Sequence, residues 1–355
     1  MERLGLVGLP NAGKSTLFSA LTGMDVAVAP HPFSTTETNM GVARVPDDRV
    51  ERLGEMSNSK KLVHTTVEFT DIAALVKGSS SGEGLGNRFL GSLREVDALV
   101  IVLRAFADDN VTGDADPEDA LATLELELVM ADLEAVQARA ERQRKAAKND
   151  PVAAAEVKAL AEAEAVLSEG TPIFRSGLAD DVRATLVPVF LLTNKPALAV
   201  VNIGDDQLDD AATLTGVIES TGLETLAVCA QLEMEAARME PDERAEMLDG
   251  LGLGEGVVPR LAASAYHLLG RRTFLTTGDK ETRAWTFRAG ASAPECAGVI
   301  HSDLQRGFIR AEVIRWDELL EIGSWAKAKD LGKIRVEGKD YVVSDGDVVE
   351  IRFNV

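Results

Sequence analysis

The chain has 355 residues, 45% of them hydrophobic and 27% charged, which suits a soluble globular protein of two or three domains. Its two cysteines, Cys229 and Cys296, lie far apart, which argues against a disulfide framework or a zinc site and is typical of a reducing cytoplasm. A formal net charge of −21 excludes a bulk basic surface for nucleic acid. Residues 276–355 are close to neutral, with 12 Lys+Arg and 14 Asp+Glu, so any contact with RNA should come from a local patch there.

Targeting and membrane segments are not expected. The first predicted strand, Leu4–Val7, begins almost at Met1, which leaves no room for a signal or transit peptide. No run approaches the roughly 18 apolar residues that a membrane helix needs. We therefore expect a cytoplasmic protein that binds neither membrane nor DNA.

The first and third quarters of the chain have the pattern of a parallel α/β sheet. Short β-branched runs alternate with helical stretches and glycine-rich loops from Glu2 to about Asp109. Strand character returns after residue 195. The predicted strands are Leu4–Val7, Thr66–Phe69, Ala98–Leu103, Pro196–Val201 and one around Leu226–Cys229.

Between these strands the composition changes to Ala, Glu, Leu, Arg and Lys, from about Pro117 to Glu169. Asn149-Asp150-Pro151 interrupts the pattern, and a second helix is predicted over Val152–Leu167, so we expect an antiparallel helical hairpin. Apolar residues at alternating steps of three and four predict a coiled-coil-like seam at Leu126, Val129, Leu133, Val136 and Ala140.

The last 80 residues form a separate small unit in this interpretation. Short strands are predicted at Asp340–Val343 and Val348–Phe353, with a turn at Asp345-Gly346-Asp347 between them. The predicted domains are a nucleotide-binding domain over residues 1–116 and 191–275, an inserted helical domain over 117–190, and a C-terminal domain over 276–355.

The motif with the most specific chemistry is Gly8-Leu9-Pro10-Asn11-Ala12-Gly13-Lys14-Ser15, a G-x-x-x-x-G-K-[ST] sequence between a predicted strand and the helical run Thr16–Leu21. Glycines let backbone N–H groups curl around a β-phosphate at the positive end of the helix. Lys14 is expected to reach the β- and γ-phosphates and Ser15 to coordinate Mg²⁺. The nucleotide-binding residues predicted here are Asn11, Ala12, Gly13, Lys14, Ser15 and Thr16.

Two further residues are predicted to complete the magnesium and γ-phosphate site. Thr35, in the segment Pro32–Asn39, is assigned to Mg²⁺ and to catalysis together with Lys14, with Thr36 as the alternative. Asp71 ends a strand and should hold the magnesium shell. Its D-x-x-G pattern has Ala74 in place of glycine, which costs roughly 1–2 kcal/mol if the switch needs a positive φ angle.

The segment after Ala74 predicts a switch without the usual catalytic side chain. Leu75 stands where many small GTPases have the glutamine that orients the attacking water, and leucine cannot do this. The long glycine-rich loop Lys77–Asn87 is interpreted as a mobile switch, with a plain flexible loop as the alternative.

The base-reading motif has two candidates. Asn194-Lys195-Pro196-Ala197 begins like N-K-x-D, but it lacks the acid and precedes its strand. Asn202-Ile203-Gly204-Asp205 follows the strand, where ligands bind in α/β sheets, and has the acid without the lysine. We assign Asn202, Ile203 and Asp205 to the base, together with Cys229 and Ala230 after the next strand; the sequence leaves ATP and GTP open.

These residues resemble the YchF / Obg-like ATPase family of translation-factor-related P-loop GTPases, over nearly the whole chain. The most specific stretches are Gly8–Thr16, Asp71–Asn87, Ala131-Asp132-Leu133-Glu134, Lys280–Phe287, Gly298–Val313 and Arg335–Val355. The resemblance implies a doubly wound P-loop sheet, an inserted coiled-coil hairpin and a C-terminal TGS domain, which is a ubiquitin-like β-grasp module.

The resemblance also implies function. It implies binding of ATP at least as good as that of GTP, slow Mg²⁺-dependent hydrolysis of ATP, association with the ribosome (the large subunit or the whole ribosome) and a role in translation or stress regulation. In this family Phe106 matches an aromatic residue that packs on the base, and Asp205 stands where relatives have a glutamate. The wider group of P-loop proteins with an asparagine at position 11 suggests a potassium ion.

Two departures from the family pattern bear on hydrolysis. Ala74 replaces the glycine, and the loop after Phe106, residues 107–113, lacks the histidine proposed for catalysis in bacterial relatives. The leading interpretation is a monomeric ribosome-associated ATPase. The alternatives are a GTP-specific switch and a nucleotide-binding interaction module with vestigial hydrolysis.

Overall fold

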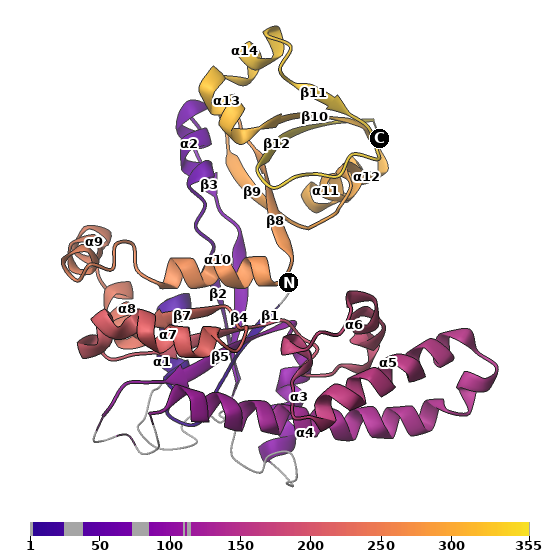
Figure 1. Cartoon of the computed structure of the whole chain (residues 1–355). Coiled ribbons are helices and arrows are strands. Elements are labelled where there is room, and N and C mark those ends of the chain that lie inside the picture. Colours follow the sequence, from indigo (N-terminus) through magenta and orange to yellow (C-terminus); the bar gives the residue numbers. More distant parts are fainter. Residues whose placement is uncertain (1–2, 25–37, 73–84, 109–110, 112–114, 355) are drawn as a thin grey trace. The chain divides into compact units, whose positions relative to one another are not determined.

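The computed structural model describes residues 3–24, 38–72, 85–108, 111 and 115–354. The chain forms two compact units, Met1–Ala43 with Glu68–Leu261, and Arg44–Val67 with Ala262–Val355 (Figure 1). Each unit contains one six-stranded sheet. Among the described residues, none of the helices combines the length and apolar composition required to cross a membrane.

The first unit is built on a sheet with the order β2-β4-β1-β5-β6-β7. Strand β1 pairs in parallel with β4 and β5, and β5, β6 and β7 continue in parallel. After β1 the chain goes to β4 on one side and then to β5 on the other, so the strand order reverses at β1, where α/β sheets bind ligands. The strands are β1 (Arg3–Val7), β2 (Asn39–Arg44), β4 (Thr66–Asp71), β5 (Ala98–Arg104), β6 (Ala197–Asn202) and β7 (Thr225–Val228).

This sheet has the fold class that the sequence predicts, a P-loop α/β domain. All seven residues of β5 are buried, as expected for a central strand covered on both faces. Val7, Leu99, Ile101 and Val201 belong to one core cluster with helix residues. The α-helices of this unit are α1 (Lys14–Thr22), α3 (Leu85–Glu95), α4 (Pro117–Gln143), α5 (Pro151–Ser168), α6 (Asp180–Leu186), α7 (Ala211–Glu219), α8 (Ala230–Ala237), α9 (Pro241–Gly250) and the start of α10 (Val258–Leu268).

Helices α4 and α5 form the predicted antiparallel hairpin, and they extend beyond the sheet (Figure 1). Each begins with the same local signal, an aspartate followed by proline: the side chains of Asp116 and Asp150 accept hydrogen bonds from backbone N–H groups of the first turn. Proline suits the first helical position because its missing N–H group has no partner there.

The predicted seam of the hairpin is correct at its distal end and wrong at its start. Val129, Val136 and Ala140 are buried against residues of α5. Leu126, however, is 54% exposed, and Leu124 and Leu128 are buried in the sheet core instead. The reason is that the first turns of α4 pack on the sheet and not on α5, so a different face of the helix is buried there.

Asp132 fastens α4 to the segment that leads into β6. Its carboxylate accepts hydrogen bonds from the backbone N–H groups of Leu192 (2.8 Å) and Thr193 (2.7 Å) and from the Thr193 hydroxyl (2.7 Å). The side chain is 1% exposed. Burial raises the pKa of Asp132, and the hydrogen bonds from Thr193 and Leu192 partly oppose this shift.

We expect Asp132→Ala to lower the free energy of unfolding by about 3 kcal/mol, because three buried donors lose their acceptor. Urea denaturation followed by far-UV circular dichroism would measure it. Glu134→Ala, an exposed position on the same helix, is the control and should change stability by less than about 0.5 kcal/mol. Equal effects of the two substitutions would show that the buried carboxylate is not an anchor.

The second unit has a mixed sheet of order β11-β10-β12-β8-β9-β3. Strands β8 and β9 form an antiparallel hairpin, β12 pairs in parallel with β8, and β10 pairs antiparallel with β12. This is a β-grasp arrangement, with α11 packed on one face. The elements are β3 (Leu62–Val63), β8 (Arg271–Thr276), β9 (Thr282–Arg288), β10 (Phe308–Arg315), β11 (Arg335–Glu337), β12 (Asp347–Phe353), α2 (Asp48–Met56), α11 (Ala293–Ile300), α12 (Ser302–Arg306), α13 (Trp316–Ile322) and α14 (Trp325–Asp330).

One strand prediction in this unit is wrong. The segment Asp340–Val343 forms only an isolated bridge between Val342 and Ser292, and β12 pairs with β10 instead of forming a hairpin with that segment. The turn residue Gly346 has a φ angle of 81°, but its backbone N–H donates to Thr273 on β8. The predicted turn is therefore present, but the two segments that flank it do not pair with each other.

The second unit also includes residues that are remote in sequence. Val50 and Leu53 of α2 pack in one core cluster with Leu275 and Ile314, and Arg49 contacts Asp345 at 2.7 Å. The predicted boundary at residue 276 coincides with the last residue of β8, whereas the compact unit begins at Ala262 and takes in Arg44–Val67. The segment between β2 and β4 thus belongs to the C-terminal unit.

Candidate nucleotide-binding site

The loop between β1 and α1 is closely packed and needs its glycines. Gly13 precedes α1 with φ 88°, and Asn11 also has a positive φ angle, 64°. A Cβ atom on Gly13 would lie 2.1 Å from Asn202 Nδ2, and one on Gly8 would lie 2.4 Å from the Val102 carbonyl oxygen. No larger residue fits either position, so the backbone itself remains available at the start of the helix.

Lys14 lies inside this loop. Its ammonium group donates to the carbonyl oxygens of Gly8 (3.1 Å) and Leu9 (3.0 Å), and the residue is 7% exposed. Burial lowers the pKa of Lys14 to about 8, while the nearby Asp71 carboxylate acts in the opposite direction. A cation held by two backbone carbonyls can turn to phosphate oxygens without crossing the loop.

Ser15 and Asp71 form the candidate metal centre. The Ser15 hydroxyl donates to Asp71 Oδ2 at 2.7 Å, across 56 residues of sequence. The other carboxylate oxygen, Asp71 Oδ1, is buried and has no hydrogen-bond partner among the described residues. Burial raises the pKa of Asp71, and Ser15 and Lys14 oppose this shift. Two hard oxygen donors side by side, one of them with an unused buried oxygen, fit Mg²⁺.

The base-side pocket lies at the carboxyl ends of β5, β6 and β7 and has a volume of about 280 Å³. It contains eight of the residues assigned to the nucleotide, from four different segments of the chain. Its lining includes Gly13, Thr16, Phe106, Asn202, Ile203, Asp205, Cys229 and Ala230. The structure therefore brings together the residues predicted from the P-loop and from Asn202–Asp205.

Asn202 connects three walls of this pocket. Its side-chain Nδ2 donates to the Ala12 carbonyl (3.0 Å), and its Oδ1 accepts from the Ala230 N–H (3.1 Å). Its own carbonyl accepts from the N–H groups of Ala105 (2.9 Å) and Phe106 (3.3 Å). The residue is 5% exposed. Its side chain is thus a strut between the P-loop and helix α8.

Phe106 forms another wall, and Arg104 holds it in place. The Arg104 guanidinium lies 4.7 Å from the centre of the Phe106 ring, and its Nε donates to the Phe106 carbonyl at 3.0 Å. Arg104 is 6% exposed. A ring supported from behind by a cation is a rigid surface on which a purine can stack.

Three polar residues that line the pocket or contact its lining were not indicated by the sequence patterns. Gln207 fixes the turn after β6, accepting from the Gly204 N–H (2.8 Å) and donating to the Ala105 carbonyl (3.1 Å). Gln231 and Glu235 line the pocket from α8 and hydrogen-bond each other at 3.1 Å. Asp205, which the sequence indicated as the acid of the motif Asn202-Ile203-Gly204-Asp205, is exposed at the edge of the pocket.

The side chains of Asn194 and Lys195, the rejected candidate for the base-reading motif, hydrogen-bond to neighbouring segments of the protein. Lys195 Nζ donates to the carbonyls of Arg94 (3.0 Å) and Val96 at the end of α3. Asn194 exchanges hydrogen bonds with Arg183 of α6. Both residues lie at the amino-end edge of the sheet, opposite to the pocket that Asn202 lines.

Several predicted residues fall outside the described part of the chain. These are Thr35, Thr36, Ala74, Leu75 and most of the loop predicted at Lys77–Asn87; its last three residues, from Leu85, instead begin helix α3. In the segment that lacks the family histidine, Ala107 and Asp108 line the pocket.

Comparisons with known proteins point to one family over the full length. A family profile described as "50S ribosome-binding GTPase" matches residues 3–143, and the YchF-GTPase C-terminal profile, described as a protein of unknown function, matches residues 272–354. The protein "Ribosome-binding ATPase YchF" of Bacillus subtilis is 45% identical over 99% of both chains. Its namesake in Escherichia coli O157:H7 is 40% identical, again over 99% of both chains.

A solved structure agrees. The YchF GTPase of Schizosaccharomyces pombe superposes with a TM-score of 0.86 at 29% identity, covering 99% of this chain and 97% of that one. The predicted resemblance is confirmed: the chain belongs to the YchF family.

Proposed function

We propose that this chain is a cytoplasmic, Mg²⁺-dependent ATPase that also accepts GTP and associates with the ribosome. Nucleotide binding and hydrolysis are proposed on one observation. Lys14, the Ser15–Asp71 pair and the base-side pocket lie together at the carboxyl ends of the strands, in the sheet whose strand order reverses at β1. The names of the relatives, ribosome-binding ATPases, support the ribosomal part.

The chemistry assigned to the site is hydrolysis of the terminal phosphate. Lys14 would move its hydrogen bonds from the carbonyls of Gly8 and Leu9 to the β- and γ-phosphates and offset their charge. Ser15, Asp71 and Thr35 would hold Mg²⁺, which would supply positive charge to offset the charge that develops on the phosphate oxygens. With Leu75 inert and no histidine in residues 107–113, we expect slow turnover.

The absence of a lysine from Asn202-Ile203-Gly204-Asp205 supports acceptance of ATP. Titration of the purified chain with mant-ATP and mant-GTP in Mg²⁺, with Lys14→Ala as the blank, tests this assignment. ATP affinity equal to or above that for GTP supports it. A preference for GTP above about tenfold, roughly 1.4 kcal/mol, would favour the GTP-specific switch instead. Stoichiometric binding without product in a turnover assay would favour the module with vestigial hydrolysis.

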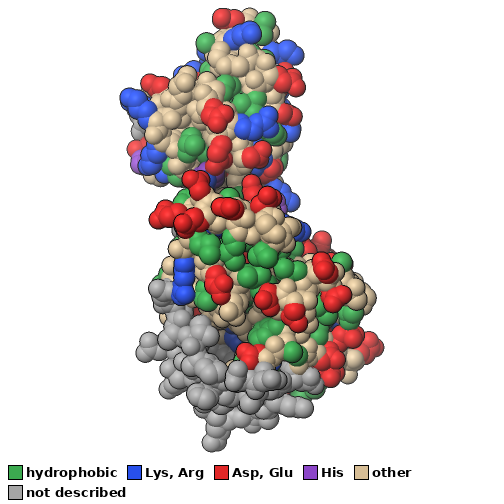
Figure 2. Space-filling view, turned by 90° about the vertical axis from the view of Figure 1, so that its left-hand side faces the viewer, with side chains coloured by type: hydrophobic (Ala, Val, Ile, Leu, Met, Phe, Trp, Pro, Cys, Tyr) green, Lys and Arg blue, Asp and Glu red, His purple; other side chains and the backbone are tan. Residues whose placement is uncertain are grey.

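We propose that the ribosome is contacted by a local cationic patch of the C-terminal unit. Arg310, Lys329 and Arg352 surround Glu312, whose side chain is 5% exposed, with nitrogen–oxygen distances of 3.5, 3.6 and 3.2 Å. On the face shown in Figure 2, Lys and Arg side chains are interspersed with acidic ones on this unit, whereas acidic side chains predominate on the described part of the other unit. Because three cations surround this one carboxylate, the patch keeps positive charge that can contact ribosomal phosphates, although the net charge of the whole chain is −21.

The double variant Arg310→Glu with Lys329→Glu should abolish co-sedimentation with 70S ribosomes at low salt and leave mant-ATP affinity unchanged. Wild-type binding should also weaken with added salt, because phosphate contacts release counterions. Undiminished co-sedimentation of the double variant would place the contact elsewhere.

We also propose that a potassium ion assists at Asn11, whose left-handed backbone (φ 64°) places it within the P-loop turn. The expected result is faster ATP hydrolysis in KCl than in NaCl of equal concentration. Asn11→Ala should remove the difference. Equal wild-type rates in the two salts would remove the potassium proposal and leave the ATPase assignment intact.

A further inference from the structure

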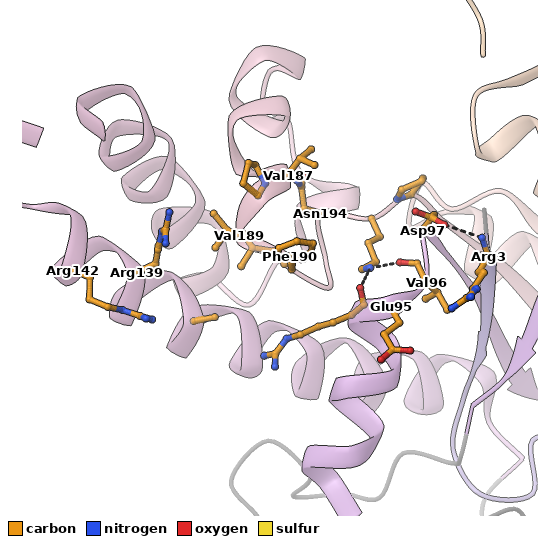
Figure 3. Close-up of a pocket in the computed structure, with 16 residues that line it drawn as sticks. Arg3, Glu95, Val96, Asp97, Arg139, Arg142, Val187, Val189, Phe190 and Asn194 are labelled. Atoms are coloured by element: carbon orange, nitrogen blue, oxygen red, sulfur yellow. Dashed lines mark hydrogen bonds between the residues drawn. The ribbon is translucent and has the colours of Figure 1, made fainter. Parts of the chain in front are cut away.

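A second cavity lies at the amino ends of the strands, the edge of the sheet opposite to the nucleotide. It has a volume of about 990 Å³ and is bounded by the starts of β1, β5 and β6, by the end of α3, by α4 and by residues 187–191 (Figure 3). We call it the amino-end groove and define it by Arg94, Asp97, Arg139, Arg142, Phe190 and Lys195. None of these residues contributes to the nucleotide pocket.

Two of the four cations that define the groove are available to a ligand. Arg139 forms an ion pair with Glu156 at 2.6 Å, and Lys195 is bound to two backbone carbonyls. Arg94 and Arg142 are exposed, and neither forms an ion pair with a carboxylate of the described residues. Both belong to residues 1–275, which carry almost all of the excess negative charge of the chain. Arg142 donates its Nε to the Ala138 carbonyl (3.0 Å), so the terminal N–H groups of both guanidinium groups remain available to acceptor oxygens.

Beside these cations the groove exposes apolar side chains on a strained backbone. Phe190 is 62% exposed and Val187 is 63% exposed. Phe190 has φ 58° and ψ 40°, which is the left-handed conformation. This conformation costs a bulky residue about 1–2 kcal/mol of backbone strain that glycine would not have. Figure 3 shows the Phe190 ring between α4, which carries Arg139 and Arg142, and the segment Glu95–Asp97. A large aromatic residue at this position stabilises neither the backbone nor a buried core.

We propose that the amino-end groove binds an acidic polypeptide segment that carries an apolar residue between its carboxylates. The carboxylates would pair with Arg94 and Arg142, and the apolar residue would pack on Phe190 and Val187. A polypeptide fits better than RNA for a reason of charge. Of the cations that define the groove, only Arg94 and Arg142 have available terminal N–H groups, and the exposed carboxylates of Glu95 and Asp97 lie in the same groove. It therefore does not provide a continuous track for a phosphate backbone. Arginine and aromatic residues together are typical centres of protein–protein contacts.

The test is selection of peptides from a random 12-residue display library on the full-length wild-type chain, followed by titration of a fluorescent enriched peptide. We expect enriched sequences with at least two Asp or Glu residues flanking an apolar one. The double variant Arg94→Glu with Arg142→Glu should weaken binding by at least about tenfold, because two opposite charges become like charges. Lys158→Glu, at a position where the side chain is 82% exposed on α5, is the control for a charge reversal outside the groove and should bind as wild type does.

Phe190→Gly separates function from stability. Glycine adopts the left-handed conformation without strain, so this variant should melt at the same temperature as wild type or higher, yet bind the peptide at least about tenfold more weakly. The proposal is overturned if no acidic sequences are enriched beyond those selected on the double variant. It is also overturned if a 12-nucleotide oligouridylate, and no peptide, binds the groove in an Arg94- and Arg142-dependent manner. Neither result bears on ATP binding.

Discussion

Replacing Lys14 by methionine should lower the rate of ATP hydrolysis by about 10³-fold and leave the fold intact. In the proposed site, the ammonium group is the charge that the loop would present to the phosphates, and removal of a preorganised charge from a water-excluded site costs this order of magnitude. Methionine has similar length and fills the same space between the carbonyls of Gly8 and Leu9. Release of inorganic phosphate under saturating Mg²⁺–ATP would measure the change.

The stability of Lys14→Met shows whether a loss of hydrolysis comes from the missing charge or from unfolding of the protein. Because burial lowers the pKa of Lys14 in the nucleotide-free chain, the charged lysine costs the folded state free energy at pH 7. Lys14→Met should therefore unfold at the same urea concentration as wild type or at a higher one. Lys158→Met is the control for loss of an exposed charge, and its hydrolysis rate should not change. Hydrolysis within threefold of wild type in Lys14→Met would remove the lysine from the catalytic site.

The residues around Lys14 show how far sequence reasoning reaches. The P-loop, its flanking strand and helix, and the position of Asn202–Asp205 after a strand follow from local patterns, and the structure places them around one pocket. Glycine spacing and strand–helix alternation are local properties, so one sequence is sufficient to read them.

The errors arise where burial depends on a distant neighbour. Leu126 follows the helical period as well as Leu124 does, but only the packing of α4 on the sheet decides which one is buried. In the same way, residues 44–67 have no local feature that assigns them to the C-terminal unit. Their place is set by contacts such as Arg49 with Asp345, across 296 residues of sequence.

Gln231, which lines the pocket, and Gln207, which hydrogen-bonds the lining residue Gly204, were missed for a related reason. Glutamine on a short helix is usually an exposed residue, and no spacing marks it as functional. Its role becomes visible only when Gln207 is seen between the Gly204 N–H and the Ala105 carbonyl, which come from two different strand ends. Hydrogen bonds between loops have no sequence signature.

Asn202 leads to the second large effect, because one side chain holds two walls of the site. Asn202→Asp changes only the atom that faces the Ala12 carbonyl, from an N–H donor to an oxygen, and keeps the acceptor for the Ala230 N–H. Two acceptor oxygens about 3.0 Å apart repel, and the P-loop must move away. We expect affinity for mant-ATP to fall by about 100-fold, roughly 2.7 kcal/mol.

Asn202→Ala should be milder than Asn202→Asp for nucleotide binding, because it removes the strut without adding a repulsion. The informative control is Asn194→Asp, the same change in the rejected motif, where Nδ2 likewise donates to a backbone carbonyl, that of Arg183 (3.0 Å), but away from the pocket that Asn202 lines. Unchanged mant-ATP affinity in Asn194→Asp, with a large loss in Asn202→Asp, would locate the nucleotide at the carboxyl ends of the strands. The reverse order would move the base to the opposite edge of the sheet, and the assignment of the pocket would fail with it.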